Sequence, residues 1–372
     1  MNLHLKPEIL LPQKITRLPW LFMLTVAIAG VIGVMAQYSA GQGTWDVYAL
    51  RHLAVFIVGC GAALLLSIVD PKDWSRWSYI LFAAMLLLII AVDIVGMMGK
   101  GAQRWLALGP LQLQPSEFMK LAVILALANY YANVSEYELA HPKYLLPPIL
   151  IILIPAIFVL RQPNLGTAII ILSLGGAMSF AAGVRLWKFL ALGGTAIAAI
   201  PVAWQFLLHD YQKSRVLTFL DPERDPLGAG YHITQAKIAL GSGGLFGKGY
   251  LDGTQAHLKF LPEAQTDFIF SLWGEEWGFI GALFFIVVYF AMIVLIFRVS
   301  LNARSLFGRL VAVGVGFNLF MYFLINIGMV MGLLPVVGIP LPLISQGGSA
   351  MLATLLGFGA VLAVAVHSEQ RA

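Results

Sequence analysis

Two carboxylates lie where a long polar stretch of the sequence gives way to a strongly apolar one. Glu263 and Asp267 both belong to FLPEAQTDFIF, residues 260–270. A carboxylate in such a position can act as a general base that takes a proton from a hydroxyl group. It can equally stabilise the first turn of a helix, because the positive end of the helix dipole favours an acid. For Asp267 both interpretations remain open, and Glu263 could be a simple solvated residue.

A second pair of ionisable residues begins another apolar stretch. Glu117 and Lys120 of QPSEFMK are three residues apart, which puts them on one face of a helix. They could form only a local ion pair. However, Lys120 lies inside the predicted membrane boundary, where ionisable groups normally face a protein interior or a polar cavity and serve a function. Glu275 and Glu276 also lie inside an apolar run, where a surface role is hard to sustain.

An arginine–tryptophan pair lies in a connection between two apolar runs. The planar guanidinium group of Arg104 pairs bidentately with anionic oxygens, so it is a candidate phosphate clamp. Trp105 is ordinarily an anchor at the membrane interface. Asp93, near the end of the preceding apolar run, either has a function of its own or holds Arg104 in place.

The glycine-rich tract GSGGLFGKG, residues 241–249, invites comparison with a nucleotide-binding loop. It does not match the P-loop pattern, because Ser242 stands at the first glycine position and Gly249 follows Lys248 where that pattern has Ser or Thr. The glycines instead indicate turns and a close approach of the backbone to a ligand. The nearby segment YHITQAKIAL fits a short amphipathic helix lying on the membrane.

The composition shows what kind of protein must position these residues. Of 372 residues, 60% are hydrophobic and only 11% are charged, whereas a soluble domain carries about 25% charged residues. The excess apolar surface must therefore face lipid. The net charge of +5 does not indicate nucleic-acid binding, because no basic patch with interleaved aromatic residues occurs. The single cysteine, Cys60, allows no disulfide within the chain, and the histidines lack the spacing of a zinc site.

Apolar runs of about 17 to 25 residues span a bilayer as helices. We expect an all-α polytopic membrane protein that forms a single domain over residues 1–372, with ten transmembrane helices. Their predicted ranges are 19–38, 51–69, 78–98, 115–133, 145–160, 166–183, 186–208, 267–297, 306–333 and 347–367.

The distribution of Lys and Arg predicts the orientation. With a cytoplasmic amino terminus, the connections rich in these residues lie inside, as the positive-inside rule requires. Both termini are then cytoplasmic. The long loop 209–266, between the seventh and eighth helices, lies outside and is expected to pack on the membrane domain. The polar connections 99–120, 161–167 and 333–349 fall on the same side, so we expect an active surface on the outer face.

Distinctive motifs follow one another along nearly the whole chain: GAQRWL, QPSE, QPNLGT, FLDPERDPLGAGYHITQAKIALGSGGLFGKG, GTQ, FLPEAQTDFIF, GEEWG and GIPLPLIS. In this order they resemble those of the SEDS family (shape, elongation, division and sporulation) of bacterial cell-wall polymerases. The segments HDYQKSR and PLGAGYHITQAKIA, with the short termini, favour the elongation branch of the family over the division-site branch.

The resemblance implies a peptidoglycan glycosyltransferase of the bacterial inner membrane. It would join lipid-linked disaccharide-peptides (lipid II) into glycan strands on the outer face during cell elongation and shape maintenance, releasing undecaprenyl diphosphate. The family's essential loop aspartate corresponds to Asp267, which would be the general base or would position that base or a cation. Glu117, Lys120 and Arg104 correspond to family residues and are expected to bind substrate, with Glu263 as a secondary candidate.

Transfer of a sugar from a diphosphate leaving group needs positive charge at the departing oxygens. Arg104, Lys120 and Arg215 are candidates for that charge, and a divalent cation, Mg²⁺ or Mn²⁺, is the alternative; no other cofactor is implied. The resemblance also implies a class B penicillin-binding protein, a transpeptidase, as partner. Two residues depart from the family pattern: Asn164 stands for an aspartate in QPNLGT, and Gln346 stands for a tyrosine in SQGGS.

Two other functions fit a polytopic chain. A flippase could carry lipid II across the bilayer, but transporters usually place their sites near the midplane on interrupted helices, whereas the polar residues here gather at one face. A non-catalytic scaffold that positions the transpeptidase is the third possibility, and it could coexist with the enzyme.

Overall fold

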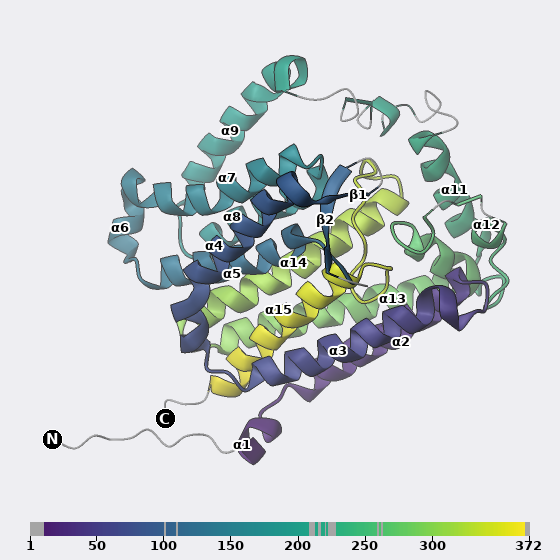
Figure 1. Cartoon of the computed structure of the whole chain (residues 1–372), viewed down its shortest axis with the longest axis horizontal. Coiled ribbons are helices and arrows are strands. Elements are labelled where there is room, and N and C mark those ends of the chain that lie inside the picture. Colours follow the sequence, from purple (N-terminus) through teal and green to yellow (C-terminus); the bar gives the residue numbers. More distant parts are fainter. Residues whose placement is uncertain are drawn as a thin grey trace.

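The computed structural model describes residues 11–99, 102–108, 111–207, 213–214, 217–219, 221, 228–258, 260–261 and 263–368. Most of these residues belong to long helices packed side by side (Figure 1). Within the described ranges, seven helical stretches are long and apolar enough to cross a membrane. They contain α2 (Trp20–Ala40), α3 (Leu50–Ser67), α4 (Pro71–Val95), α7 (Leu146–Arg161), α13 (Ile269–Asn302), α14 (Leu306–Val330) and α15 (Gly348–His367). The architecture therefore agrees with a multi-pass helical membrane protein.

Further helices occupy the remaining predicted apolar ranges: α5 (Pro115–Ala132), α8 (Leu165–Ala181) and α9 (Leu186–Val202). Shorter helical elements are α1 (Leu11–Thr16), η1 (Trp45–Ala49), α6 (Glu136–Ala140), η2 (Pro142–Leu145), η3 (Ala203–Leu207), α11 (Ala229–Ser242) and α12 (Thr254–His257).

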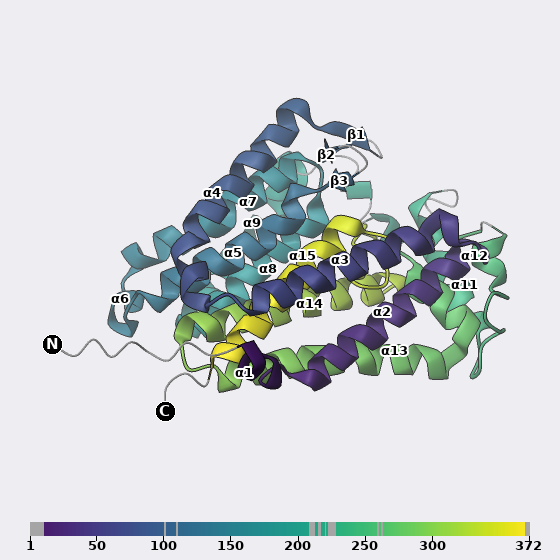
Figure 2. The same ribbon diagram turned by 60° about the horizontal axis from the view of Figure 1, so that its bottom comes forward.

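Helix α5 lies inside the bundle, where it contacts α4, α8, α14 and α15 (Figure 2). It begins at Pro115, whose fixed φ suits the first helical position, and continues through Ala- and Leu-rich sequence that favours a helix. Almost every residue from Pro115 to Asn129 is buried, including Glu117 and Lys120. The two charged groups are therefore enclosed by protein and do not face lipid.

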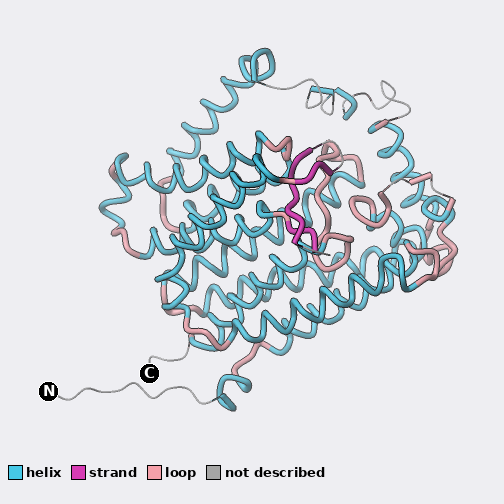
Figure 3. Tube along the Cα trace, viewed as in Figure 1, coloured by secondary structure: helices cyan, strands magenta, loops and turns pink. Residues whose placement is uncertain are grey.

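One connection departs from the expected all-α class. It contains a small antiparallel sheet of β1 (Met97–Gly99), β2 (Ala102–Leu108) and β3 (Leu111–Leu113), in the order β1–β2–β3 (Figure 3). Leu106 pairs with Leu113, and Leu108 pairs with Leu111. The two strands flank a Gly-Pro dipeptide, a strong turn signal. Strands this short escape prediction from apolar runs, so the expected all-α class was wrong for this connection.

One helix of the 209–266 loop packs on the spanning helices. Helix α11 is the predicted amphipathic segment, and it contacts both α13 and α14. Arg215, a predicted substrate-binding residue, lies outside the described residues.

The glycine-rich tract approaches a helix. A Cβ atom on Gly243 would lie 2.1 Å from the carbonyl oxygen of Gly274, and one on Gly247 would lie 2.0 Å from that of Glu276. Gly278 has φ 65° and kinks α13 beside the tract. These glycines allow a close approach of the tract to the backbone of α13. The predicted approach to a ligand stays a prediction.

Candidate functional site

Asp267 lies in the turn just before α13 and is partly exposed. Helix α13 begins at Ile269 after Phe268, and its first turn contains no acid. The interpretation of Asp267 as an acid in that first turn was therefore wrong, because the helix begins two residues later than the apolar pattern predicts. Gly338, with φ 73°, passes directly beside the carboxylate, since a Cβ there would lie 3.5 Å from Oδ2 of Asp267.

Hydrogen bonds fix the backbone of this turn at successive residues. The side-chain amide of Asn326 on α14 donates to the carbonyl oxygen of Asp267 at 3.0 Å. The Ser345 hydroxyl donates to the Thr266 carbonyl at 2.5 Å. The Gln265 carbonyl accepts from the Gln346 backbone N–H at 2.8 Å and from the Gln37 side chain at 3.0 Å. The carboxylate is thus carried by a backbone segment held from α2, α14 and the loop before α15.

Glu263 stabilises the beginning of the same turn. Its Oε2 accepts a hydrogen bond from the Thr266 hydroxyl at 3.1 Å, and its carbonyl accepts from the Thr266 N–H at 3.0 Å. Glu263 has φ 57°, in the left-handed region, and is partly exposed. Glu263 and Asp267 therefore belong to one turn, and Glu263 helps to shape it.

Glu117 and Lys120 form a buried ion pair with a distance of 2.9 Å. The hydroxyl of Tyr322 on α14 donates to Glu117 and accepts from Lys120. Because Tyr322 and Asn326 lie four residues apart on α14, they share one face of that helix. The buried triad and the anchor of the Asp267 turn therefore lie on neighbouring turns of one helix.

Arg104 fixes β2 to the turn between α7 and α8. Its Nε donates to the Gln162 carbonyl at 2.7 Å, and an Nη donates to the Pro163 carbonyl. The Gln162 side chain in turn donates to Asp93 at 2.8 Å. Gln162 thus connects Asp93 to Arg104. These two contacts of Arg104 are to backbone carbonyl groups, so the guanidinium has a clear positioning role.

Asn164 begins α8 as its N-cap. Its side-chain oxygen accepts from the Thr167 N–H at 3.4 Å, and the residue is buried. Asparagine and aspartate cap helices about equally well. Asn164, where the family pattern has an aspartate, therefore preserves the cap.

A cavity of about 220 Å³ opens beside the Asp267 turn. Its lining combines cationic, aromatic and amide groups: Arg51, His52, Val55, Trp105, Gln112, Gln346, Gly347, Gly348 and Met351. Gln346 joins the cavity to the turn through its bond to Gln265. Sequence reasoning missed Arg51 and Gln112 as lining residues. Arg51 lies at the start of α3 and Gln112 lies in β3, and nothing in the sequence indicates that the two line one cavity.

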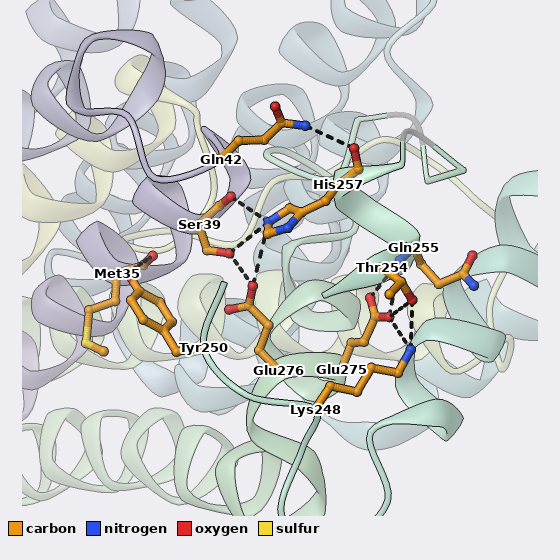
Figure 4. A network of polar contacts seen from close by, with 10 residues as sticks. All are labelled: Met35, Ser39, Gln42, Lys248, Tyr250, Thr254, Gln255, His257, Glu275 and Glu276. Carbon is orange, nitrogen blue, oxygen red and sulfur yellow. Dashed lines mark hydrogen bonds and ion pairs between the residues drawn. The ribbon is translucent and has the colours of Figure 1, made fainter. Parts of the chain in front are cut away.

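Glu275 and Glu276 anchor the glycine-rich tract and do not face lipid (Figure 4). Glu275 pairs with Lys248 at 2.6 Å and accepts from the Thr254 hydroxyl at 3.0 Å. Glu276 accepts from the Ser39 hydroxyl, and His257 lies 3.9 Å from the same carboxylate oxygen. The partners of Glu275 and Glu276 lie far away in sequence, so these contacts could not be predicted from the local pattern.

Tyr250 adds a further link between the tract and α2. Its hydroxyl donates to the Met35 carbonyl at 3.0 Å. Burial, and then the nearby charge of Glu276, raises the pKa of Tyr250 to about 12. The hydroxyl therefore remains protonated, and remains a donor, at neutral pH.

Known proteins resemble this chain over nearly its whole length. Residues 16–370 match the FtsW/RodA/SpoVE model, described as "Cell cycle protein". The chain is 40% identical over 355 residues to "Peptidoglycan glycosyltransferase MrdB" of Escherichia coli strain K12, covering 94% of each protein. It is 35% identical over 361 residues to "Probable peptidoglycan glycosyltransferase FtsW" of Trichlorobacter lovleyi, again covering 94% of each.

Two solved structures have the same fold. A chain of a peptidoglycan synthase complex, studied for the structural coordination of polymerization and crosslinking, superposes with a TM-score of 0.81 at 32% identity; the match covers 95% of this chain and 99% of that one. The Thermus thermophilus rod shape determining protein RodA superposes with a TM-score of 0.71 at 29% identity, covering 95% and 98%.

Proposed function

Because the chain belongs to the FtsW/RodA/SpoVE family, we propose that it is a peptidoglycan glycosyltransferase that polymerises lipid II during cell elongation. The similarity to MrdB over almost the full length supports the activity, and the similarity to a rod shape determining protein supports the elongation branch. The observation that carries the proposal is the placement of Asp267. Its carboxylate is partly exposed, while the backbone beneath it is fixed and a polar cavity opens beside it.

In the reaction, an acceptor sugar hydroxyl attacks the anomeric carbon of the donor. The new glycosidic C–O bond forms as the bond to the diphosphate oxygen breaks, and undecaprenyl diphosphate leaves. The Asp267 carboxylate takes the hydroxyl proton directly, or positions the group that does so. Fixing the turn at Thr266 and Asp267 keeps the carboxylate in place without reorganisation.

Charge for the departing diphosphate is proposed to come from arginine side chains. Arg51 lines the cavity and, within the described ranges, makes no hydrogen bond or ion pair. Arg104 and Lys120, proposed as substrate-binding residues on the resemblance, also hold protein groups, so Arg51 is the better placed cation. Arg215 stays in the proposal as a predicted residue outside the described ones.

A divalent cation is the alternative source of charge. In the described part of the chain, no three His, Cys, Asp or Glu residues are grouped to hold a metal ion. Mg²⁺, however, is commonly bound by one or two carboxylates together with substrate phosphates and water, a role open to Asp267. When bound, the ion would neutralise developing charge on the diphosphate.

The membrane arrangement proposed with this function has ten spans, with α5, α8 and α9 completing the seven apolar stretches. The chain forms one domain in the bacterial inner membrane, with both termini cytoplasmic and the 209–266 loop outside. A class B penicillin-binding protein is the proposed partner. The structural similarity to a synthase that coordinates polymerization and crosslinking supports that proposal.

Polymerisation by purified protein tests the proposal. The chain, together with its transpeptidase partner, is supplied with lipid II as wild type, Asp267→Ala and Asp46→Asn; Asp46 is an exposed acid in η1 and serves as the control. We expect glycan polymer from the wild type and Asp46→Asn only. Equal polymer from Asp267→Ala would refute the assignment of Asp267. Absence of polymer from every variant, with lipid II crossing vesicles, would favour a flippase.

A further inference from the structure

A second polar cavity lies at the other end of the bundle from Asp267. It has a volume of about 270 Å³ and is enclosed by the start of α4, the turn between α13 and α14, and the end of α15. Helix α13 begins just after Asp267 and ends at Asn302, beside this cavity. The two ends of α13 lie at opposite ends of the bundle (Figure 2). The cavity is therefore a separate site from the Asp267 turn.

Basic groups from all three segments meet in this cavity. Lys72, Arg304 and His367 line it, and none of them forms an ion pair with another described residue. The Nδ1 atom of His367 contacts the Ala363 carbonyl at 2.9 Å. That contact makes Nδ1 the donor, and it leaves Nε2 for a ligand.

The other polar side chains of the lining are already engaged. Asp70, the acid in the cavity, accepts from the Lys72 backbone N–H at 2.9 Å as the N-cap of α4. The Ser75 hydroxyl donates to Asn129 at 2.7 Å, and the Ser305 oxygen accepts from the Gly308 N–H at 3.1 Å. Asp70 keeps its negative charge, so the cavity sets Lys72, Arg304 and His367 against one carboxylate. The balance is basic, which favours an anion.

An apolar crevice continues from this cavity between α4, α14 and α15. Pro71, Phe307 and Val364 line both spaces. Trp74 also lines the crevice, and its buried indole N–H has no hydrogen-bond partner in the described part of the chain. The crevice holds only about 10 Å³, so it takes no acyl chain. The cavity itself combines basic groups with apolar residues, which matches the phosphate region of an amphiphile with an anionic head.

We infer that this cavity binds the phosphate group of an anionic phospholipid. Lys72 and Arg304 pair with the phosphate, Nε2 of His367 is left to contact it, and the acyl chains remain in the surrounding bilayer. Helix ends lie at the headgroup level of a bilayer, and basic pockets between spanning helices are known sites for anionic headgroups. Basic residues that merely set topology need not converge on a cavity, whereas these residues do.

Lipid binding by the delipidated full-length chain tests the inference. Native mass spectrometry would measure retention of phosphatidylglycerol, with phosphatidylcholine and inorganic phosphate as comparison ligands. Each Lys or Arg near an anionic headgroup contributes about fivefold in affinity, so Lys72→Ala with Arg304→Ala should weaken phosphatidylglycerol binding about 30-fold. The matched control combines Arg76→Ala and Arg298→Ala, which remove two exposed charges outside the cavity.

If the control variant weakened phosphatidylglycerol binding as much as Lys72→Ala with Arg304→Ala, the effect would come from net charge alone. That result would overturn the inference. Binding of inorganic phosphate without selective retention of phosphatidylglycerol would also overturn it, since the site would then hold free phosphate. Because the measurement does not involve polymerisation, its outcome is independent of the proposed enzymatic function.

Discussion

The side chain of Asn326 joins the Asp267 turn to the loop that crosses it. Its amide donates to the carbonyl of Asp267 at 3.0 Å and to that of Ile339 at 2.8 Å. Asn326 is fully buried, and the loop residue before Ile339, Gly338, lies beside the Asp267 carboxylate. One amide group therefore holds the two backbone segments that flank the candidate catalytic group.

Replacing Asn326 with leucine should impair polymerisation. The substitution keeps the side-chain size but leaves two carbonyl groups unpaired, at about 1–3 kcal/mol for each buried group. A misplacement of about 1 Å in a catalytic group can lower the rate about 100-fold, so we expect kcat to fall at least tenfold with a smaller change in KM. Asn318→Leu, on the same helix, is the control, because the Asn318 side-chain oxygen has no partner among the described residues. Wild-type kcat in Asn326→Leu would show that this residue does not position Asp267.

A double-mutant cycle should reveal strong coupling between Glu117 and Lys120. Removing one member of a buried ion pair leaves an uncompensated charge and costs about 3–5 kcal/mol. We expect Glu117→Gln and Lys120→Met each to lower the thermal unfolding midpoint sharply, and the combined variant to lower it by less than their sum. If the shifts in unfolding midpoint were additive, Glu117 and Lys120 would stabilise the fold independently of each other.

Glu117→Ala should also reduce polymerisation of lipid II, since the proposal gives this residue a place in substrate binding. Activity is best measured at a temperature well below the unfolding midpoint of the variant, so that loss of fold does not mimic loss of function. Normal polymerisation by folded Glu117→Ala would restrict Glu117 to a structural role.

Gly247 and Gly244 provide a matched comparison of backbone packing. Both have positive φ, 84° and 57°, but a Cβ on Gly247 would meet the Glu276 carbonyl at 2.0 Å, whereas one on Gly244 meets nothing within 4 Å. Gly244→Ala should cost about 1–2 kcal/mol from φ alone. Gly247→Ala should lower the unfolding midpoint much further and expose Lys248 to trypsin. Equal effects of the two substitutions would contradict the packing of the tract on α13.

Asn164→Asp should leave stability almost unchanged, because both residues are good N-caps, whereas Asn164→Ala should cost about 0.5–2 kcal/mol. Thermal unfolding of the three proteins checks the order. If Asn164→Asp changed polymerisation without changing stability, the carboxylate at this position would have a task beyond capping α8.

The sequence predicts the helices well, because runs of apolar residues long enough to span a bilayer leave few other structures open. It also places Glu117 and Lys120 on one face of a helix, and the ion pair that they form is one of the two interpretations left open for them. The small sheet was missed, since two of its three strands have only three residues and carry too little pattern to detect. The start of α13 was placed two residues early because Asp267 and Phe268 continue smoothly into an apolar run.

The contacts that shape the site were beyond prediction for a different reason. Asn326 is a single amide inside an apolar run, and its partners Asp267 and Ile339 are recognisable only once α14 is placed beside them. The contacts of Glu275 and Glu276 likewise depend on Lys248, Ser39 and His257, which reach the two carboxylates only through folding.

The hydrogen bonds that hold the backbone around Asp267 affect how the enzyme can use the free energy of substrate binding. The turn at 265–267 is attached to Ser345, Gln346 and Asn326 by hydrogen bonds within the protein. Substrate binding therefore does not have to drive the assembly of this part of the catalytic face. The interaction energy from the rest of a large lipid-linked substrate then remains available to lower the barrier to glycosyl transfer, because little of it is consumed in reorganising the protein.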